Sequence, residues 1–249
     1  MGPTPDPGNI DLAHFSVGSM LRVGVAFRRD LRGVDTLEEA ARVVARYLHQ
    51  HCVDPESGET TCALARVYKT HRYGDLPRDL KRFADRQIGS TKPGRNMRCL
   101  ALLATSGDRP EWNARELSES HQVIALPNAE MVRKAPMILR LIEELGLDVD
   151  AVVAGSPAPE RTDARTYDVF HVEDALGSPH IPAQREFVVP FGIKSVVGFG
   201  GLLRSGELLA VILFSRVRIP AQSAARFRTI ALDVRSSFYQ IDESRTWVP

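Results

Sequence analysis

The segment from Arg185 to Tyr239 constrains the fold more than any other part of the chain. Two apolar, strand-like runs between Phe187 and Phe214 flank the turn sequence Arg204-Ser205-Gly206-Glu207. A helix is expected from about Gln222 to Tyr239, because apolar side chains recur there at helical spacing. They are Ala224, Phe227, Ile230 (or Ala231), Val234 and Phe238. The pattern predicts a β-hairpin closed by an amphipathic helix.

The upstream half predicts further strands and helices. Thr36, or alternatively Asp35, caps a helix that carries Leu37, Ala41, Val44 and Leu48 on one face. Strands are expected at 62–69, 97–105, 121–126 and 148–153, and helices at 77–83 and 128–145, with Pro136 interrupting the second helix. Most strands follow one another without regular crossover helices. This order favours an α+β fold with an antiparallel sheet.

The chain divides into a tail, a short N-terminal segment and one domain. Residues 1–9 are rich in Pro and Gly and are expected to be disordered. In residues 10–34, Leu21, Val25 and Leu31 could share one helical face, although Gly18 and Gly24 weaken it. Residues 35–249 are expected to form a single domain with an elaborated region at about 106–165. No flexible linker separates two self-sufficient apolar sets.

Composition excludes several classes of protein. Of 249 residues, 43% are hydrophobic, which is enough for a sizeable core, and 32 basic residues balance 31 acidic ones. This balance argues against nucleic acid or an anionic membrane as a partner bound through overall charge. No apolar run reaches the roughly 18 residues of a spanning helix, and the start lacks signal-peptide order. Three cysteines, an odd count, fit reduced thiols in a cytoplasmic protein.

The order of elements resembles the GAF domain, over roughly Asp35 to Tyr239. The runs Tyr68-Lys69-Thr70-His71-Arg72-Tyr73-Gly74 and Val188-Val189-Pro190-Phe191-Gly192 are similar to ones found in sensor modules at the front of bacterial signalling kinases. The resemblance implies a central antiparallel sheet, with terminal helices on one face and a ligand pocket on the other. It also implies a cytoplasmic sensory domain that binds an unidentified small molecule, without catalytic output of its own, and acts on a kinase or another output protein.

The resemblance further implies a homodimer paired through the terminal helices. The apolar faces that would pair are Leu37, Val44 and Leu48 on the first helix and Phe227, Val234 and Phe238 on the last. The alternative is that these side chains only cover their own sheet. The cyclic-nucleotide motif of some GAF relatives is absent.

The ligand site is expected in the segment from Tyr167 to Pro182, which precedes the hairpin. It combines aromatic, imidazole and carboxylate groups, which can hold a polar ligand against an apolar wall. The predicted ligand-binding residues are Tyr167, Phe170, His171, Asp174 and His180. The alternative interpretation is a well-packed loop whose histidines cap backbone groups.

Metal and cofactor signals are weak. His49, His51 and Cys52 end a helix, but their spacing is not a zinc pattern, so no metal site is predicted. Cys62 and Cys99 are not followed by histidine, which argues against a covalent bilin. No cofactor is identified; axial haem ligation would fall to His121, His171 or His180. Gly198-Phe199-Gly200-Gly201 lies in a strand run and is not a P-loop. Its glycines either let a ligand or backbone approach closely or mark a bulge.

Two other functions compete with the sensor. The spacing of Cys52 and Cys62 resembles that of two cysteines in the GAF-related reductases of free methionine sulfoxide, which would make the chain a thiol-dependent enzyme. That function requires an accessible thiol of low pKa and a resolving partner. The third hypothesis is a structural interaction module whose degenerate pocket is filled by its own side chains.

Overall fold

The computed structural model describes residues 9–89, 92–119, 121–155 and 169–248. Its centre is a six-stranded, fully antiparallel sheet with strand order β3-β2-β1-β6-β5-β4. The strands are β1 (Cys62–Arg72), β2 (Arg98–Gly107), β3 (Val123–Leu126), β4 (Phe170–Val172), β5 (Ser195–Leu202) and β6 (Leu208–Ser215). The expected α+β fold class is therefore confirmed.

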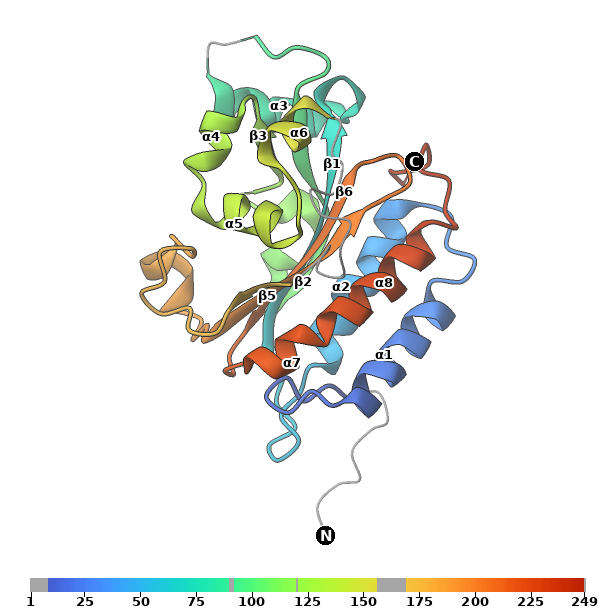
Figure 1. The fold of residues 1–249 in the computed structure, drawn as a ribbon, viewed down its shortest axis with the longest axis vertical. Helices are drawn as coiled ribbons and strands as arrows, with labels where there is room; N and C mark the ends of the chain where they lie inside the picture. Colours follow the sequence, from blue (N-terminus) through green and yellow to red (C-terminus); the bar gives the residue numbers. More distant parts are fainter. Residues whose placement is uncertain (1–8, 90–91, 120, 156–168, 249) are drawn as a thin grey trace.

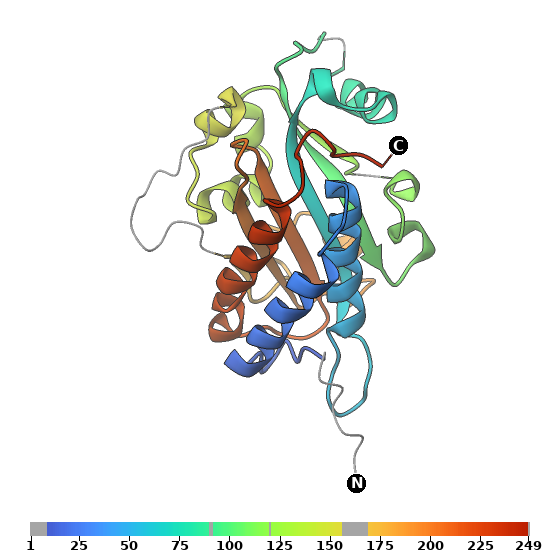
Figure 2. The same cartoon turned by 90° about the vertical axis from the view of Figure 1, so that its right-hand side faces the viewer.

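Helices from both ends of the described chain cover one face of this sheet (Figures 1 and 2). They are α1 (Val17–Asp30), α2 (Leu37–His51), α7 (Ala221–Ala225) and α8 (Phe227–Phe238). The cap predicted for α2 is present, because the Thr36 hydroxyl accepts a hydrogen bond from the Glu39 amide at 3.2 Å. The final helix is interrupted at Arg226, but its predicted stripe of apolar side chains is buried as expected.

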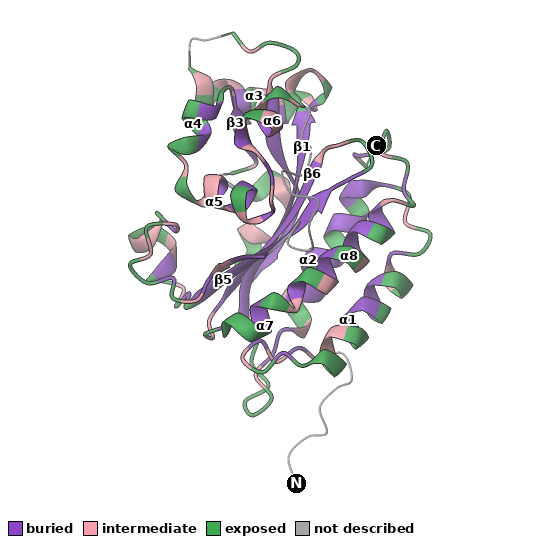
Figure 3. Ribbon diagram, in the orientation of Figure 1, coloured by how far each residue is buried: buried purple, intermediate pink, exposed green. Residues whose placement is uncertain are grey.

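The opposite face carries the shorter helices of the connection. These are α4 (Ala129–Arg133), α5 (Pro136–Glu144) and α6 (Val149–Ala154), with a π-helical turn at Gln184–Val188, while α3 (Arg78–Ile88) packs beside β3. Successive side chains of β1 point to opposite faces of the sheet. Ala65 and Val67 belong to the core under the terminal helices, whereas Leu64 and Tyr68 belong to the core on the other face. In Figure 3 strands β5 and β6 are buried along their length, and the helices are exposed on their outer sides.

Two local predictions are corrected by the structure. Residues 149–154 form a helix instead of a strand, because the Asp148 carboxylate caps it by accepting from the Ala151 amide at 2.7 Å. The first hairpin strand begins at Ser195, because the chain around Phe187 turns in the π-helical segment. Strand β4 at Phe170–Val172 is an addition. The predicted tail, residues 1–9, lies outside the described residues except for position 9.

The N-terminal segment packs into the same core as the domain. The Ile10 amide donates to the His51 carbonyl at 2.7 Å, and the Val53 amide donates to the Ile10 carbonyl at 3.1 Å. Phe15 stacks on Phe227 with ring centroids 5.0 Å apart. At the other end, the Glu38 amide donates to the Thr246 carbonyl. Residues from both ends of the described chain therefore meet on α2.

The glycines of β5 permit close backbone approach, one of the two roles expected from the sequence. A Cβ built on Gly200 would lie 2.0 Å from the Leu209 carbonyl oxygen of the paired strand β6. No residue with a side chain fits there without moving the hairpin. None of the helices in the described part of the chain is long and apolar enough to cross a membrane.

Candidate ligand-binding site

A cavity of about 930 Å³ lies on the sheet face opposite the terminal helices. Its floor is formed by β1 and β6, and its walls come from residues 109–119 and 121–124, from the start of α5, and from residues 181–191. The floor residues are Leu64, Arg66, Tyr68, Ile212 and Phe214. A volume of this size can hold a small-molecule ligand, since such sites typically measure about 300–1,000 Å³.

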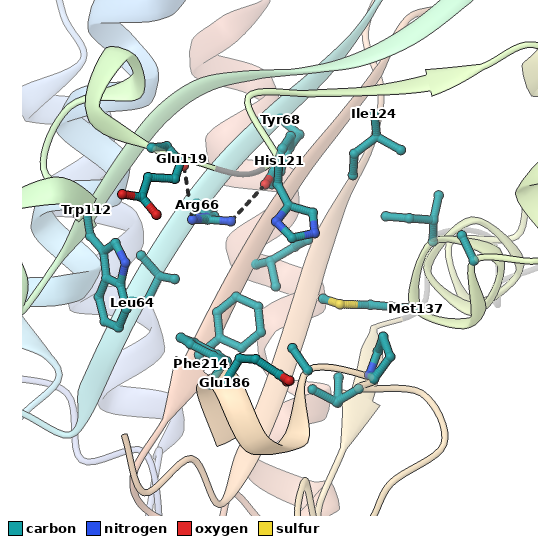
Figure 4. A pocket seen from close by; sticks show the side chains of 18 of the residues that line it. Leu64, Arg66, Tyr68, Trp112, Glu119, His121, Ile124, Met137, Glu186 and Phe214 are labelled. Carbon is teal, nitrogen blue, oxygen red and sulfur yellow. Dashed lines mark hydrogen bonds between the residues drawn. The ribbon is translucent and has the colours of Figure 1, made fainter. Parts of the chain in front are cut away.

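An aromatic cluster lines one side of the cavity. The Trp112 ring lies 4.6 Å from Phe191 and 5.6 Å from Phe187, and Phe187 in turn meets Phe214 of β6 edge-on at 5.0 Å. Met137 of α5 and Ile124 of β3 add apolar surface, as Figure 4 shows. Most of the wall is therefore suited to an apolar or aromatic body.

The floor carries one charged side chain, Arg66, on the central strand β1. Its Nη1 donates to the Tyr68 hydroxyl at 3.4 Å and its Nη2 to the Ser118 hydroxyl at 3.3 Å (Figure 4). Its Nε is buried and has no hydrogen-bond partner in the described part of the chain. Both contacts are long and go to neutral oxygens, whereas charge-assisted bonds to carboxylates measure about 2.7–2.9 Å.

His121 points its ring into the cavity beside Tyr68 (Figure 4). Its backbone is left-handed, with φ of 63°, which is uncommon for a residue with a side chain. Although the residue as a whole is exposed, enclosure of the ring lowers its pKa, and the nearby Arg66 guanidinium adds to this effect. The imidazole is therefore predominantly neutral at pH 7.

The other charged groups lie at the rim. Arg109 forms an ion pair with Glu111, and its guanidinium stacks over the Phe191 ring at 5.6 Å. Glu119 and Glu186 line the cavity from exposed positions. In the described residues, no carboxylate lies within ion-pair distance of Arg66. The floor is therefore cationic and the rim acidic.

The residues predicted from the sequence occupy a neighbouring part of the fold. Tyr167 falls outside the described residues. Phe170 is fully buried in β4, and His171 donates from Nε2 to the Ile219 carbonyl at 2.8 Å. Asp174 is exposed, and its carboxylate accepts from the Leu176 amide. His180 is half-buried and adjoins Ile181, which does line the cavity.

The four described residues of that prediction do not themselves line the cavity. Burial lowers the pKa of His171, and the hydrogen bond to Ile219 partly offsets this shift. Of the four, only His180 lies in the loop that enters the cavity wall. Its Nδ1 is buried without a partner among the described residues. A role for these residues in ligand binding stays a prediction.

The histidines considered for metal or haem are scattered. His49 contacts Asp108 at 3.0 Å through Nε2, while the His51 ring stacks on Tyr47 at 4.3 Å. Within the described ranges, no group of three or more His, Cys, Asp or Glu side chains could hold a metal ion. Of the three haem candidates, only His121 lines the cavity.

All three cysteines are free, buried thiols. Burial raises the pKa of Cys99 to about 12, and it raises the pKa of both Cys52 and Cys62. Cysteine chemistry requires an accessible thiolate, which burial in apolar surroundings opposes. None of the three lines the cavity. These thiols therefore do not offer the properties that the reductase hypothesis requires.

A second buried polar group lies at the far end of β1. The Arg98 guanidinium pairs with Glu207 at 2.5 Å and donates to the Gly155 carbonyl at 3.0 Å. Glu207 also accepts from the Thr70 hydroxyl at 2.5 Å. These contacts tie β1 and β2 to the turn of the β5–β6 hairpin. Because the charges compensate each other there, we assign this group a structural role.

No protein-family model matches the sequence, and no curated protein matches it either. Among solved structures, the chain is similar to free methionine-R-sulfoxide reductase from Neisseria meningitidis, with 8% identity, a TM-score of 0.49, and coverage of 96% of this chain and 93% of that one. It is also similar to the GAF domain of a phosphoenolpyruvate-protein phosphotransferase from Coxiella burnetii, with 11% identity, a TM-score of 0.44, and coverage of 89% and 93%.

A third similarity is to the phycoerythrobilin-bound GAF domain of a cyanobacterial phytochrome, at 12% identity and a TM-score of 0.43, covering 89% of this chain and 94% of that one. Similarity at this level does not carry a function. The chain's own architecture is more informative, because the antiparallel sheet has terminal helices on one face and a cavity on the other. The fold is GAF-like. In this GAF-like chain the connection expected to be elaborated, around 106–165, supplies two cavity walls.

Proposed function

We propose that this GAF-like chain is a sensory or regulatory domain that binds a small molecule in the cavity above β1 and β6. The observation that carries the proposal is the cavity itself, about 930 Å³ in volume, with an apolar wall and few polar groups. An unfilled cavity of this size favours the sensor over the structural module with a filled pocket.

A single strand, β1, links the cavity to the layer of terminal helices. Arg66 and Tyr68 face the cavity, whereas Ala65 and Val67 of the same strand pack under the terminal helices. A ligand that shifts β1 would therefore change the packing of α2, which in turn contacts α8. We propose that these helices transmit the signal to an output protein, such as a kinase. The presence of three buried cysteines that form no disulfide with one another supports a cytoplasmic location.

Trp112 offers a direct test, because it lines the cavity while the second tryptophan, Trp247, stacks near His71 and Arg115 instead. In a Trp247→Phe variant all tryptophan emission comes from Trp112. Titration with the low-mass fraction of an extract from the source cells should change that emission. The matched Trp112→Phe variant should show a much smaller change. An unchanged Trp112 signal at saturating extract would count against the proposal.

A further inference from the structure

We propose that the cavity recognises an organic monocarboxylate with an apolar, preferably aromatic, body, and that Arg66 binds the carboxylate. This inference rests on the proposed function and assigns the ligand its chemical class.

Arg66 carries the polar half of the argument. It projects from the middle of β1, where its neighbours on the cavity face are the apolar Leu64 and the buried Tyr68. Its two hydrogen bonds go to hydroxyl groups at 3.3 and 3.4 Å, and its Nε is buried without a partner among the described residues. Arg66 therefore has no counter-ion among the described residues. A planar carboxylate could supply one, because its two oxygens can accept from two guanidinium N–H groups at once.

The count of charges favours one negative charge over two. Arg109 is already paired with Glu111, so it adds no free positive charge. Glu119 and Glu186 at the exposed rim oppose additional negative charge on the ligand. One uncompensated guanidinium in the floor therefore matches a monocarboxylate better than a phosphate dianion.

The apolar half of the ligand follows from the wall next to Arg66. Trp112, Phe187 and Phe191 form a continuous aromatic surface with centroid spacings of 4.6 to 5.7 Å. In Figure 4 Trp112 lies on one side of Arg66 and Met137 on the other. A ligand whose carboxylate reaches Arg66 must lay the rest of its body against this surface. Aromatic bodies gain most there, because offset and edge-on ring contacts are favourable.

His121 adds a geometric observation. Its left-handed backbone, with φ of 63°, directs the ring into the cavity next to Arg66 (Figure 4). Backbone conformations of this kind persist only where surrounding structure holds them, and they cluster at binding sites. A carboxylate bound by Arg66 would therefore lie beside this ring.

The test compares three compounds that share a phenylpropyl skeleton and differ in charge: hydrocinnamate, hydrocinnamamide and phenylpropylammonium. Affinities are measured by calorimetry and by Trp112 emission in the Trp247→Phe background. We expect hydrocinnamate to bind about tenfold or more tightly than the amide. A hydrogen bond to a charged group contributes more binding free energy than a neutral one, and the difference corresponds to about tenfold in affinity. Phenylpropylammonium should bind most weakly.

Variants on the same strand complete the test. Arg66→Gln should abolish the preference for the carboxylate over the amide, whereas Arg66→Lys, which keeps the charge, should retain part of it. The matched control is Arg72→Gln, because Arg72 is exposed on the same strand outside the cavity. Should Arg66→Gln not fold, the charge series on the unmodified chain and on Arg66→Lys still decides.

Equal or tighter binding of the amide or the ammonium compound would overturn the carboxylate assignment while leaving small-molecule binding intact. A preference that survives in Arg66→Gln would equally overturn the role of Arg66. Absence of binding by all three compounds would overturn the assignment as well. The extract titration with Trp112 then decides separately whether the cavity binds another class of ligand.

Discussion

At the residue scale, Phe199 shows how completely the sheet is covered by the terminal helices. Its side chain is fully buried in β5 and stacks on Phe227 of α8 at 5.2 Å. Phe199→Asp would bury an unpaired carboxylate, so we expect a loss of at least about 4 kcal/mol in unfolding free energy and no cooperative thermal transition. The control Leu117→Asp changes an exposed side chain and should melt normally. Near-normal melting of Phe199→Asp would contradict the packing.

His71 makes a prediction about pH. Burial lowers its pKa well below the ordinary value, and the Lys69 and Arg98 charges add to this effect. As the pH falls below about 6.5, the unfolded chain takes up a proton that the folded chain resists, so stability should fall. Above that pH this contribution is constant. The slope due to one histidine is at most about 1.4 kcal/mol per pH unit.

The measurement is denaturant unfolding between about pH 7.5 and about pH 5, which covers most of the range in which histidine titrates. His71→Phe keeps a ring against Trp247, 5.2 Å away, and should flatten the slope. His14→Gln, which removes an exposed histidine instead, serves as the control. An equally steep slope in His71→Phe would assign the acid sensitivity to other groups.

Individual site residues were only partly predictable from sequence. A signal for Arg66 exists, because it is the one charged residue in the apolar run from Cys62 to Tyr68. Its partner Ser118 is 52 positions away, and Trp112 reaches Phe191 across an even longer separation. Such proximity depends on how the connection folds over the sheet, which local patterns do not encode. The segment at 167–182 has the chemistry of a binding site, but none of its four described candidate residues lines the cavity.

At the scale of elements, the sequence predicts helices and strands correctly where a capping residue, a turn sequence or a periodic apolar pattern is present. The Thr36 cap, the β5–β6 hairpin and the stripe on α8 all follow from short-range chemistry. The helix at Val149–Ala154 could have been predicted from its Asp148 cap and the left-handed Gly155 at its end. Helix α1 forms despite Gly24, which lies against Asp233 of α8, because packing outweighs a glycine penalty of about 1 kcal/mol.

The apolar faces of α2 and α8, which the sequence suggests for a homodimer, pack against the chain's own core. Leu37, Val44 and Leu48, like Phe227, Val234 and Phe238, are fully buried in the chain's own core. An apolar stripe on α1 is exposed instead, with Val17, Leu21 and Val25 each more than half accessible, and Leu232 on α8 is similar. If the homodimer forms, we expect it to bury this stripe.

Leu21→Asp should therefore convert a dimer into a monomer without loss of thermal stability, as measured by sedimentation at micromolar concentration. Leu176→Asp is the control, because Leu176 is equally exposed but lies in the loop after β4. If the unmodified chain is a monomer, the prediction of a homodimer is wrong. A Leu21→Asp variant that stays dimeric would place the interface elsewhere.

At the scale of the whole molecule, we expect a single cooperative domain. The cores on both sheet faces share the same strands, and residues near both ends meet on α2. Limited proteolysis should remove the first residues but stop before Ile10, whose backbone is paired with His51 and Val53. A cut within Gly155–Asp163 should leave two pieces that remain associated and unfold together. Two independently folded fragments would contradict the one-domain prediction.

The central claim, that a small molecule occupies the cavity, is tested most directly by native mass spectrometry of the chain isolated from its own cells. We predict a non-covalent mass increment on the unmodified protein. Ile212→Trp, which projects bulk from the cavity floor, should lose this increment, whereas Leu232→Trp on the exposed side of α8 should retain it. An unmodified chain that carries no increment and is stabilised by no fraction of the extract would contradict the claim, as would an increment that Ile212→Trp leaves unchanged.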